Sequence, residues 1–189
     1  MVKDMVLKNR SYRRFYGDYK IERGVLEELI ELARLSPSGR NLQPLKYFIS
    51  NEEKSNTEIF QALAWAGYLK DWDGPEEFER PTAYIVMLID KNLTSSTPAI
   101  DEGIASQSIL LGTVEKGLGG CIIQSVKRAE LAAVLNIPDS LEIALVIALG
   151  KPKEEVRIVA VKDDEIKYYR DSEGIHYVPK RDLKDIIIG

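Results

Sequence analysis

The run GIASQSILLGTV at residues 103–114 contains no charged residue. A helix on a protein surface carries charges at every turn, so a helix over residues 98–116 should be buried nearly all round. Small residues such as Gly103 and Gly112 let another backbone approach it closely. A domain of 189 residues has few ways to surround such a helix, and a subunit interface is a natural second source of cover. Gly117 is expected to end the helix in the usual C-terminal position.

Segments on both sides of this run predict the strands and helices that surround it. The apolar runs at 83–89 and 141–149 predict strands, and the continuous apolar stretch 144–149 is typical of a sheet centre. Ser125 is the expected N-cap of the helix predicted at residues 125–135. Further strands are predicted at residues 45–50, 119–124, 156–161, 165–169 and 175–178, and further helices at residues 3–9, 22–35, 52–64 and 125–135. The pattern indicates a mixed α and β class with helices on a sheet of about five strands, and residues 1–189 read as a single domain.

The composition places the chain among ordinary globular proteins. Hydrophobic residues make up 44% and charged residues 30% of the sequence, and the formal net charge of -4 disfavours a broad nucleic-acid-binding face. Cys121 is the single cysteine, so no internal disulfide forms, which fits a reducing compartment. The N-terminus lacks the apolar region of a signal peptide, and the apolar runs are too short to span a membrane. We therefore expect a cytoplasmic protein with no membrane association.

Two polar clusters stand out against this background, and the first is RSYRRF at residues 10–15. Guanidinium groups with a nearby hydroxyl suit a phosphate dianion. Arg10, Arg13 and Arg14 are spaced i, i+3 and i+4, so they share one face if a helix continues through them. The alternative is a solvated basic helix end that complements the helix dipole. Lys180-Arg181 is a second basic pair, of a kind that any protein surface carries.

The second cluster is SPSGRNLQP at residues 36–44, between a predicted helix end and a strand. Short hydroxyl and amide side chains in such a loop offer donors and acceptors to the edge of a flat heterocycle. The candidates for this role are Ser38, Asn41 and Gln43. The alternative is a helix C-cap followed by ordinary turn residues. Together the two clusters indicate the phosphate end and the ring end of a site for a nucleotide-like cofactor.

No side chain in the sequence stands out as a catalytic acid, base or nucleophile. His176 is the single histidine, and with Cys121 it makes no metal site of recognised spacing. We expect a structural or surface role for His176 and a core position for Cys121. Residues 65–81 form a long irregular excursion that begins at Trp65, and its aromatic side chains are expected to form core or a wall. The absence of an evident catalytic acid, base or nucleophile favours an enzyme whose cofactor performs the reaction.

With these motifs in place, the sequence resembles the FMN-dependent nitroreductase family. The resemblance spans essentially the whole chain and rests on RSYRRF, SPSGRNLQP, the stretch GIASQSILLGTVEKGLGGCIIQS at residues 103–125, and VPKRDL at residues 178–183. It implies a three-layer α+β fold with a mixed, mostly antiparallel sheet flanked by helices. It also implies an intertwined homodimer with two FMN sites at the interface, which agrees with the charge-free run and with a tail that ends in three isoleucines.

The resemblance also assigns residues to the cofactor. The cofactor-binding residues that it implies are Arg10, Ser11, Arg13, Ser38, Asn41, Gln43, Ile122, Gln124, Ser125, Lys180 and Arg181. The basic residues and Ser11 would approach the phosphate, and the loop at 36–44 would come from the other subunit with Asn41 toward the ring edge. Residues 122–125 would lie along the isoalloxazine ring, with the Ser125 backbone N–H near flavin N5.

The function implied is that of an oxidoreductase that uses NADH or NADPH to reduce nitroaromatic, quinone or related small acceptors. The reaction would be a two-step hydride relay through flavin N5, so no catalytic side chain and no metal are expected. Two alternatives stay open. One is a flavin-binding protein without turnover that sequesters or senses FMN, and the other is a nucleotide-binding regulatory domain that binds no flavin.

Overall fold

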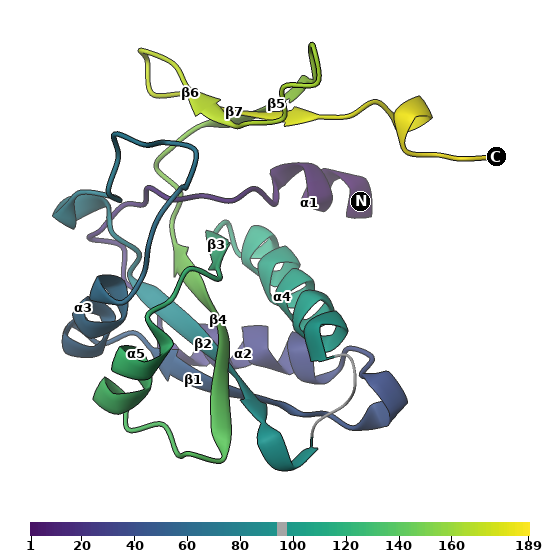
Figure 1. Cartoon of the computed structure of the whole chain (residues 1–189). Helices are drawn as coiled ribbons and strands as arrows, with labels where there is room; N and C mark the ends of the chain where they lie inside the picture. Colours follow the sequence, from purple (N-terminus) through teal and green to yellow (C-terminus); the bar gives the residue numbers. More distant parts are fainter. Residues whose placement is uncertain (94–97) are drawn as a thin grey trace.

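The computed structural model describes residues 1–93 and 98–189 (Figure 1). Its helices are α1 (Val2–Lys8), α2 (Arg23–Arg34), α3 (Glu53–Gln61), α4 (Pro98–Glu115) and α5 (Arg128–Val134). Its strands are β1 (Leu45–Ser50), β2 (Ala83–Asp90), β3 (Gly119–Ile123), β4 (Leu141–Gly150), β5 (Val156–Ala160), β6 (Tyr169–Arg170) and β7 (His176–Lys180). Short 3-10 turns occur at Gly39–Asn41, Glu77–Glu79, Lys91–Leu93 and Leu183–Asp185. Most of these helices and strands lie within a few residues of the predicted ones.

Four strands form one antiparallel sheet in the order β1-β2-β4-β3, with a bulge in β2 between Met87 and Leu88. The other strands form a separate three-stranded sheet in the order β5-β7-β6, in which β5 and β7 run parallel. The main sheet has four strands rather than about five because β5, β6 and β7 pair with one another. The strand predicted at 165–169 is wrong over most of its length: only Tyr169 belongs to β6, since residues 162–165 form a turn.

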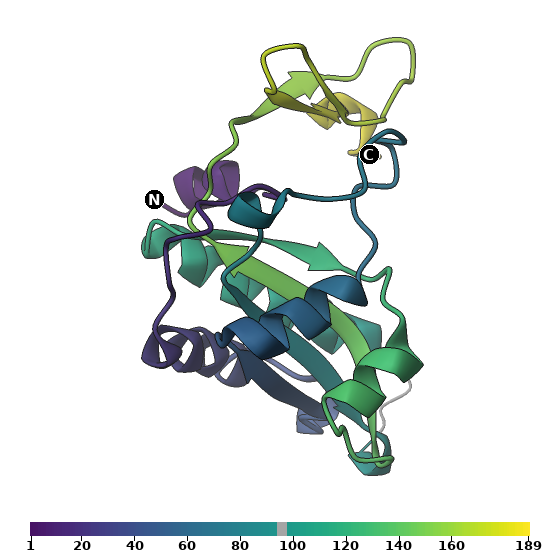
Figure 2. The same cartoon turned by 90° about the vertical axis from the view of Figure 1, so that its left-hand side faces the viewer.

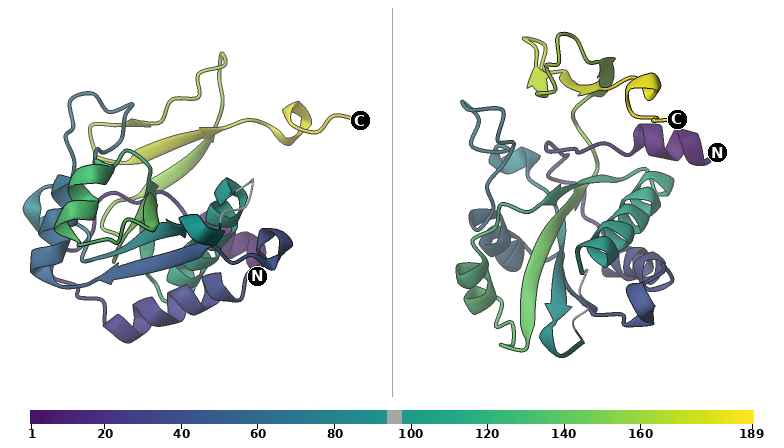
Figure 3. Two further views of the ribbon diagram at one scale, coloured as in Figure 1. Left: turned by 60° about the horizontal axis from the view of Figure 1, so that its bottom comes forward. Right: turned by 45° about the vertical axis from the view of Figure 1, so that its right-hand side comes forward.

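Helices cover both faces of the main sheet (Figure 2). α2 and α4 lie on one face, where Ile109 belongs to a core that includes Ile147 of β4. α3 and α5 lie on the other face, where Leu131 belongs to a core that includes Val146. One strand supplies both cores because neighbouring side chains of a strand point to opposite faces. This three-layer arrangement, seen along the sheet in the right panel of Figure 3, confirms the predicted α+β fold class.

One chain buries only one side of α4. Ala105 and Ile109 pack in the core, and a Cβ on Gly112 would meet side chains of α2. In contrast, Gly103 and Gln107 are exposed. The prediction of burial nearly all round is therefore not met within a single chain. We refer to the exposed side as the bare side of α4, and it carries no charge within the run 103–114.

The C-terminal residues extend away from the main sheet (Figure 1). Ile186, Ile187 and Ile188 are 61%, 58% and 100% exposed. Within one chain, these three side chains stay largely uncovered. Exposed isoleucine side chains are unfavourable in water, at about 25 cal/mol per Å² of apolar surface. The tail and the bare side of α4 are thus two surfaces that the chain leaves uncovered.

The helix start predicted at Ser125 is wrong. α5 begins at Arg128, with Lys127 in the N-cap position. The Ser125 carbonyl instead accepts a hydrogen bond of 2.9 Å from the backbone N–H of Ala64. Because this contact keeps the chain extended beyond β3, the helix starts only after the contact has been made.

Candidate active site

The N-terminal basic cluster lies on an extended segment rather than on a helix. α1 ends before the cluster, and Ser11 forms a parallel bridge with Gly120 of β3. Arg14 donates hydrogen bonds of 2.5 and 2.7 Å to the buried carboxylate of Glu79. The shared face considered for the three arginines is therefore wrong. Arg13 and Arg14 are neighbours in an extended chain, so their side chains point to opposite sides.

Two glycines at the start of β3 let this segment approach the sheet. A Cβ on Gly119 would lie 2.5 Å from the Tyr12 ring, which is closer than packing allows. The next glycine, Gly120, accepts a hydrogen bond of 3.1 Å from the Tyr12 backbone N–H. The pairing brings Arg13 next to Ile122, further along the same strand.

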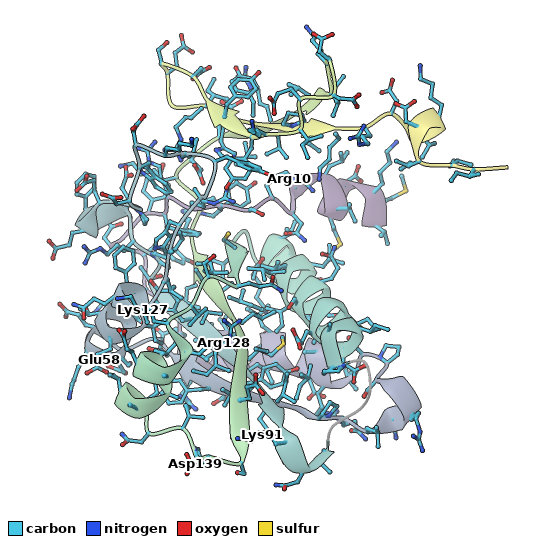
Figure 4. The ribbon with its side chains drawn as sticks, in the orientation of Figure 1. Arg10, Glu58, Lys91, Lys127, Arg128 and Asp139 are labelled. Atoms are coloured by element: carbon cyan, nitrogen blue, oxygen red, sulfur yellow. The ribbon has the colours of Figure 1, made fainter. Side chains whose placement is uncertain are left out.

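A cavity of about 300 Å³ is formed by this segment together with residues of α4, β3 and the C-terminal part of the chain. The three-stranded sheet β5-β7-β6, which we call the small sheet, contributes His176, Val178 and Lys180. We call this space the cationic cavity, and its lining residues are Asn9, Arg10, Ser11, Arg13, Gln107, Leu110, Ile122, Tyr168, His176, Val178 and Lys180. Arg10, Arg13 and Lys180 bring positive charge, and no carboxylate belongs to the lining. The Arg10 Nε is buried without a hydrogen-bond partner in the described part of the chain. Figure 4 shows Arg10 between α1 and the small sheet, and such a donor set suits an anion with several oxygens.

A buried carboxylate fixes the backbone around Arg13. The Glu154 side chain accepts a hydrogen bond from the Arg13 backbone N–H and another of 3.1 Å from the Arg170 guanidinium. The Arg13 guanidinium itself donates to the Ser11 carbonyl at 3.2 Å and lies 3.4 Å from His176 Nε2. Glu154 is thus engaged with the Arg13 main chain, which leaves the guanidinium directed toward the cavities.

His176 lines the cationic cavity and is only 1% exposed. Burial lowers the pKa of His176 to about 4, and the Arg13 and Arg170 guanidiniums act in the same direction. The imidazole is therefore neutral near pH 7. An arginine only donates hydrogen bonds, so the Nε2 atom is the acceptor from Arg13 and the proton sits on Nδ1. That Nδ1 is buried without a partner among the described residues.

A second cavity, of about 220 Å³, continues from the first along β3. We call it the aromatic cavity, and its lining residues are Arg13, Ala64, Trp65, Ala66, Gly67, Cys121, Ile122, Ile123, Gln124, Ser125 and Tyr168. Arg13, Ile122 and Tyr168 line both cavities, which therefore form one strip with charge at one end. Ile122 is 40% exposed in the middle of this strip, so it offers an apolar surface to a ligand.

The excursion at residues 65–81 provides one wall of the strip. Trp65 is 8% exposed and belongs to the core between the main sheet and helices α3 and α5. Tyr68 is 48% exposed, and its ring centroid lies 4.9 Å from that of Tyr168. The prediction that these aromatic residues form core or a wall is confirmed for Trp65, which does both.

The second polar cluster lies beside the N-terminal end of α4. Asp101 is 3% exposed and accepts hydrogen bonds of 2.6 Å from the Ser38 hydroxyl and 2.9 Å from the Gly39 N–H. Asn41 and Gln43 have φ angles of 55° and 51°. Such left-handed backbone costs on the order of 1–3 kcal/mol for a residue other than glycine. The buried carboxylate therefore holds a strained loop in one shape.

This loop, residues 36–44, is named the Ser38 loop, and it does not line the cationic cavity within one chain. Ser38 and Gln43 line a different cavity, of about 220 Å³, and Asn41 is exposed. Arg181 also lies apart, in an exposed ion pair of 2.9 Å with Asp164. Of the predicted site residues, the chain gathers into the strip Arg10, Ser11, Arg13, Ile122, Gln124, Ser125 and Lys180.

Sequence reasoning missed several residues that shape these sites. Tyr168 and Gln107 were not singled out, and His176 was not placed in the cavity. Asp101 left a partial signal, because it lies in the first turn of α4, directly before Glu102 and the charge-free run 103–114. Tyr168 left none, since its contact with Tyr68 joins residues 100 positions apart.

Within residues 1–93 and 98–189, no helix combines the length and apolarity needed to cross a membrane. In the same described part, no three His, Cys, Asp or Glu side chains gather into a cluster that could hold a metal ion. The linings of the strip offer cationic, amide, hydroxyl, imidazole, thiol, aromatic and aliphatic groups.

Known proteins share both the sequence pattern and the fold. The profile of the nitroreductase family matches residues 6–151. An iodotyrosine deiodinase of Thermotoga neapolitana is 26% identical over 174 residues, which cover 82% of this chain and 90% of that protein. An FMN-dependent nitroreductase of Clostridium difficile R20291 superposes with a TM-score of 0.67 at 22% identity, over 86% of this chain and 92% of its own. A nitroreductase family protein of Streptococcus pneumoniae TIGR4 superposes with a TM-score of 0.71 at 18% identity, over 100% of both chains. The profile spans the basic cluster, the Ser38 loop, α4 and β3, and the chain therefore belongs to the nitroreductase family of oxidoreductases.

Proposed function

We propose that this protein is an FMN-dependent oxidoreductase that uses NADH or NADPH to reduce small acceptors such as quinones or nitroaromatic compounds. The observation that carries the proposal is the strip along β3, where the cationic cavity continues past Ile122 into the aromatic cavity. FMN has the same layout, with a phosphate at one end and a flat ring at the other. Family membership supports the proposal, since one protein of this fold is an FMN-dependent nitroreductase.

The cationic cavity fits the phosphate of FMN. Arg10, Arg13 and Lys180 bring positive charge, and Ser11 brings a hydroxyl. An anion that drew the Arg10 guanidinium into the cavity would give its unpaired Nε a partner, and a buried donor without one is costly. Guanidinium groups bind phosphate through parallel hydrogen bonds, so they would fix the orientation of the ligand as well as its affinity.

The far end of the strip fits the isoalloxazine ring. Ile122 would lie against the ring face, and Gln124 and the Ser125 backbone N–H would lie at its edge, with that N–H near N5. Bound FMN would supply the redox chemistry, taking a hydride from the nicotinamide at N5 and passing it to the acceptor. The residues of the chain would bind and orient the ring, and Arg13, which lines both cavities, would bring positive charge toward it.

We further propose that a second copy of the chain completes the site. Ser38, Asn41 and Gln43 lie outside the strip of their own chain, so they would reach the ring edge of a partner subunit. The bare side of α4 and the exposed isoleucines at 186–188 would contribute to the interface of the homodimer. Each chain would act as one domain over residues 1–189, with an FMN site at each end of the shared interface.

Among the described residues, Arg181 is the one proposed phosphate ligand whose side chain already forms an ion pair. Its ion pair with Asp164 joins side chains that are 48% and 86% exposed. Exposed pairs of this kind contribute about 0–1 kcal/mol, so a phosphate would displace Asp164 at little cost.

The first test is the visible absorption of the purified protein. We expect flavin bands that bleach under anaerobic conditions when NADH or NADPH is added, and that return when a quinone or nitroaromatic compound follows. Bands that bleach with neither donor would favour a flavin-binding protein without turnover. A colourless protein that takes up no added FMN would contradict the proposal.

Arg13→Ala and Arg14→Ala form a matched pair for the phosphate site. Arg13 lines both cavities, whereas Arg14 is bonded to Glu79. A hydrogen bond to a charged group contributes about 1.5–3 kcal/mol, so Arg13→Ala should raise the Kd for FMN by about 10- to 100-fold in a fluorescence titration. Arg14→Ala should lower the stability toward urea and leave the Kd close to that of the wild type. An unchanged Kd for Arg13→Ala would exclude Arg13 as a phosphate ligand.

A further inference from the structure

Tyr168 lies where the two cavities meet and lines both of them. It directly precedes β6 and so belongs to the C-terminal part of the chain, whereas Ile122 beside it belongs to the main sheet. Its ring contacts Arg13, His176 and Tyr68, which come from three different parts of the sequence. One aromatic residue thus joins the cationic cavity to the excursion that provides the wall.

On the side of the cationic cavity, Tyr168 supports Arg13. The Arg13 Cζ lies 4.8 Å from the centroid of the Tyr168 ring, a distance at which the ring face attracts the cation. The His176 ring lies 5.2 Å from the same ring, and its Nε2 lies 3.4 Å from the guanidinium. Because His176 is neutral, it accepts a hydrogen bond from Arg13 rather than repelling it. The Tyr168 ring is therefore one of three groups, with the Ser11 carbonyl and His176, that hold this guanidinium.

On the other side, Tyr168 holds the excursion. The two ring centroids of Tyr68 and Tyr168 are 4.9 Å apart, and the Tyr68 backbone N–H donates to the Tyr168 hydroxyl at 3.4 Å. A second contact places the Arg170 guanidinium 4.7 Å from the Trp72 ring. Residues 66–76 contain no helix or strand, and such a segment opens locally at low cost unless contacts of this kind hold it.

We propose that Tyr168 is a positioning residue that couples phosphate binding at Arg13 to the ordering of the excursion over the aromatic cavity. The inference rests on the proposed FMN site, whose phosphate would be the ligand of Arg13. A bound phosphate holds the guanidinium, the guanidinium holds the Tyr168 ring, and the ring and its hydroxyl hold Tyr68. Coupling between two sites is reciprocal, so a fastened excursion also strengthens phosphate binding.

Three variants separate this role from simple packing. Tyr168→Leu removes the ring and the hydroxyl, and Tyr168→Phe removes only the hydroxyl. Tyr169→Leu is the matched control, because Tyr169 is 49% exposed, stacks on Tyr177 at 5.0 Å and lines neither cavity. Backbone hydrogen exchange of residues 66–76 is measured without ligand, with riboflavin and with FMN. Riboflavin carries the same ring but no phosphate.

In the wild type and in Tyr169→Leu, saturating FMN should slow exchange in residues 66–76 by on the order of fivefold, and riboflavin should slow it much less. Tyr168→Leu should still bind FMN, with a Kd raised by a similar factor, but should lose the protection that FMN confers. Tyr168→Phe should keep most of that protection, because its ring still lies between Arg13 and Tyr68.

Three results would overturn the inference. If riboflavin and FMN protect residues 66–76 of the wild type equally, the phosphate takes no part in the coupling. If FMN protects these residues fully in Tyr168→Leu, Tyr168 takes no part in it. The same loss of protection in Tyr169→Leu would mean that the small sheet has merely been disturbed. A wild type that shows no FMN binding in the titration refutes the proposed function instead, and that failure is seen before any exchange is measured.

Discussion

The basic cluster of the cationic cavity and the Ser38 loop were both visible as polar clusters in the sequence, but the fold uses them in different ways. The cationic cavity is assembled from residues as far apart as Asn9 and Lys180, all within one chain. The Ser38 loop is shaped locally, through bonds from Ser38 and Gly39 to the carboxylate of Asp101. One chain therefore holds a formed cationic cavity and, in another place, a Ser38 loop that is held in shape but does not line that cavity. A loop can be ready for a ligand without being part of a complete site.

The largest effect is expected when two damaged chains are mixed. Arg13→Ala removes a proposed phosphate ligand from the cationic cavity. The double variant Ser38→Ala/Asn41→Ala removes the polar groups that the Ser38 loop is proposed to offer. Each variant alone should therefore retain little FMN after gel filtration. If every site takes its cavity from one chain and its loop from the partner, a mixed dimer contains one intact site. Refolding equal amounts together should then restore FMN to about a quarter of all sites, through random pairing in a twofold dimer.

Each variant refolded alone is the control for this experiment. A mixture that retains no more FMN than the separate variants would show that cavity and loop do not combine across an interface. The separation of the Ser38 loop from the strip within one chain would then need another explanation.

Asp101→Ala should have the next largest effect, on stability. It removes the acceptor of the Ser38 hydroxyl and of the Gly39 N–H, and a bond to a charged group contributes about 1.5–3 kcal/mol, so we expect the free energy of unfolding to fall by about 3 kcal/mol. Asp139→Ala is the control, since Asp139 is exposed and lies far from the loop (Figure 4). Urea unfolding measures both. Equal stability of the two variants would show that the strained loop keeps its shape without the carboxylate.

The smallest effect concerns the charge of the cationic cavity. The pKa of His176 is lowered to about 4 in the folded chain, while that of an unfolded histidine is about 6.5. Between these values the unfolded chain binds more protons, so stability should rise with pH from about 4 to about 6.5, by about 2.5 kcal/mol. His176→Gln should flatten this part of the profile in urea unfolding. FMN should flatten it as well, because a phosphate nearby favours the protonated ring.

If the free energy of unfolding of His176→Gln rises with pH as steeply as that of the wild type, His176 is not the source of this pH dependence. Other groups would then be responsible for it. Glu79 is one such group, since Arg14 and Lys153 hold its pKa at about 2. Its stabilising contribution is present above about pH 4.5 and is lost as the pH falls toward 2, which is a different window. The two residues can therefore be told apart in one profile.

Much of the fold was predictable because its signals are local. The charge-free run at 103–114 predicted α4, and the apolar runs predicted β2 and β4 at the centre of the sheet. Gly117, with a φ angle of 68°, follows α4 as expected. The error at Ser125 has the opposite origin, because a contact with Ala64 overrode a local capping preference.

By itself, the sequence determined most of the segments that form helices and strands, which residue types are suited to a phosphate and a ring, and that the run 103–114 within α4 carries no charge. These properties follow from periodicity, capping and side-chain chemistry within short windows. Only the tertiary structure decided that Arg13 and not Arg14 faces the cavity, and that His176, 163 positions away, lies beside it. It also decided that the Ser38 loop lies apart from the strip. The physical reason is that these contacts join distant segments, and packing rather than local preference selects them.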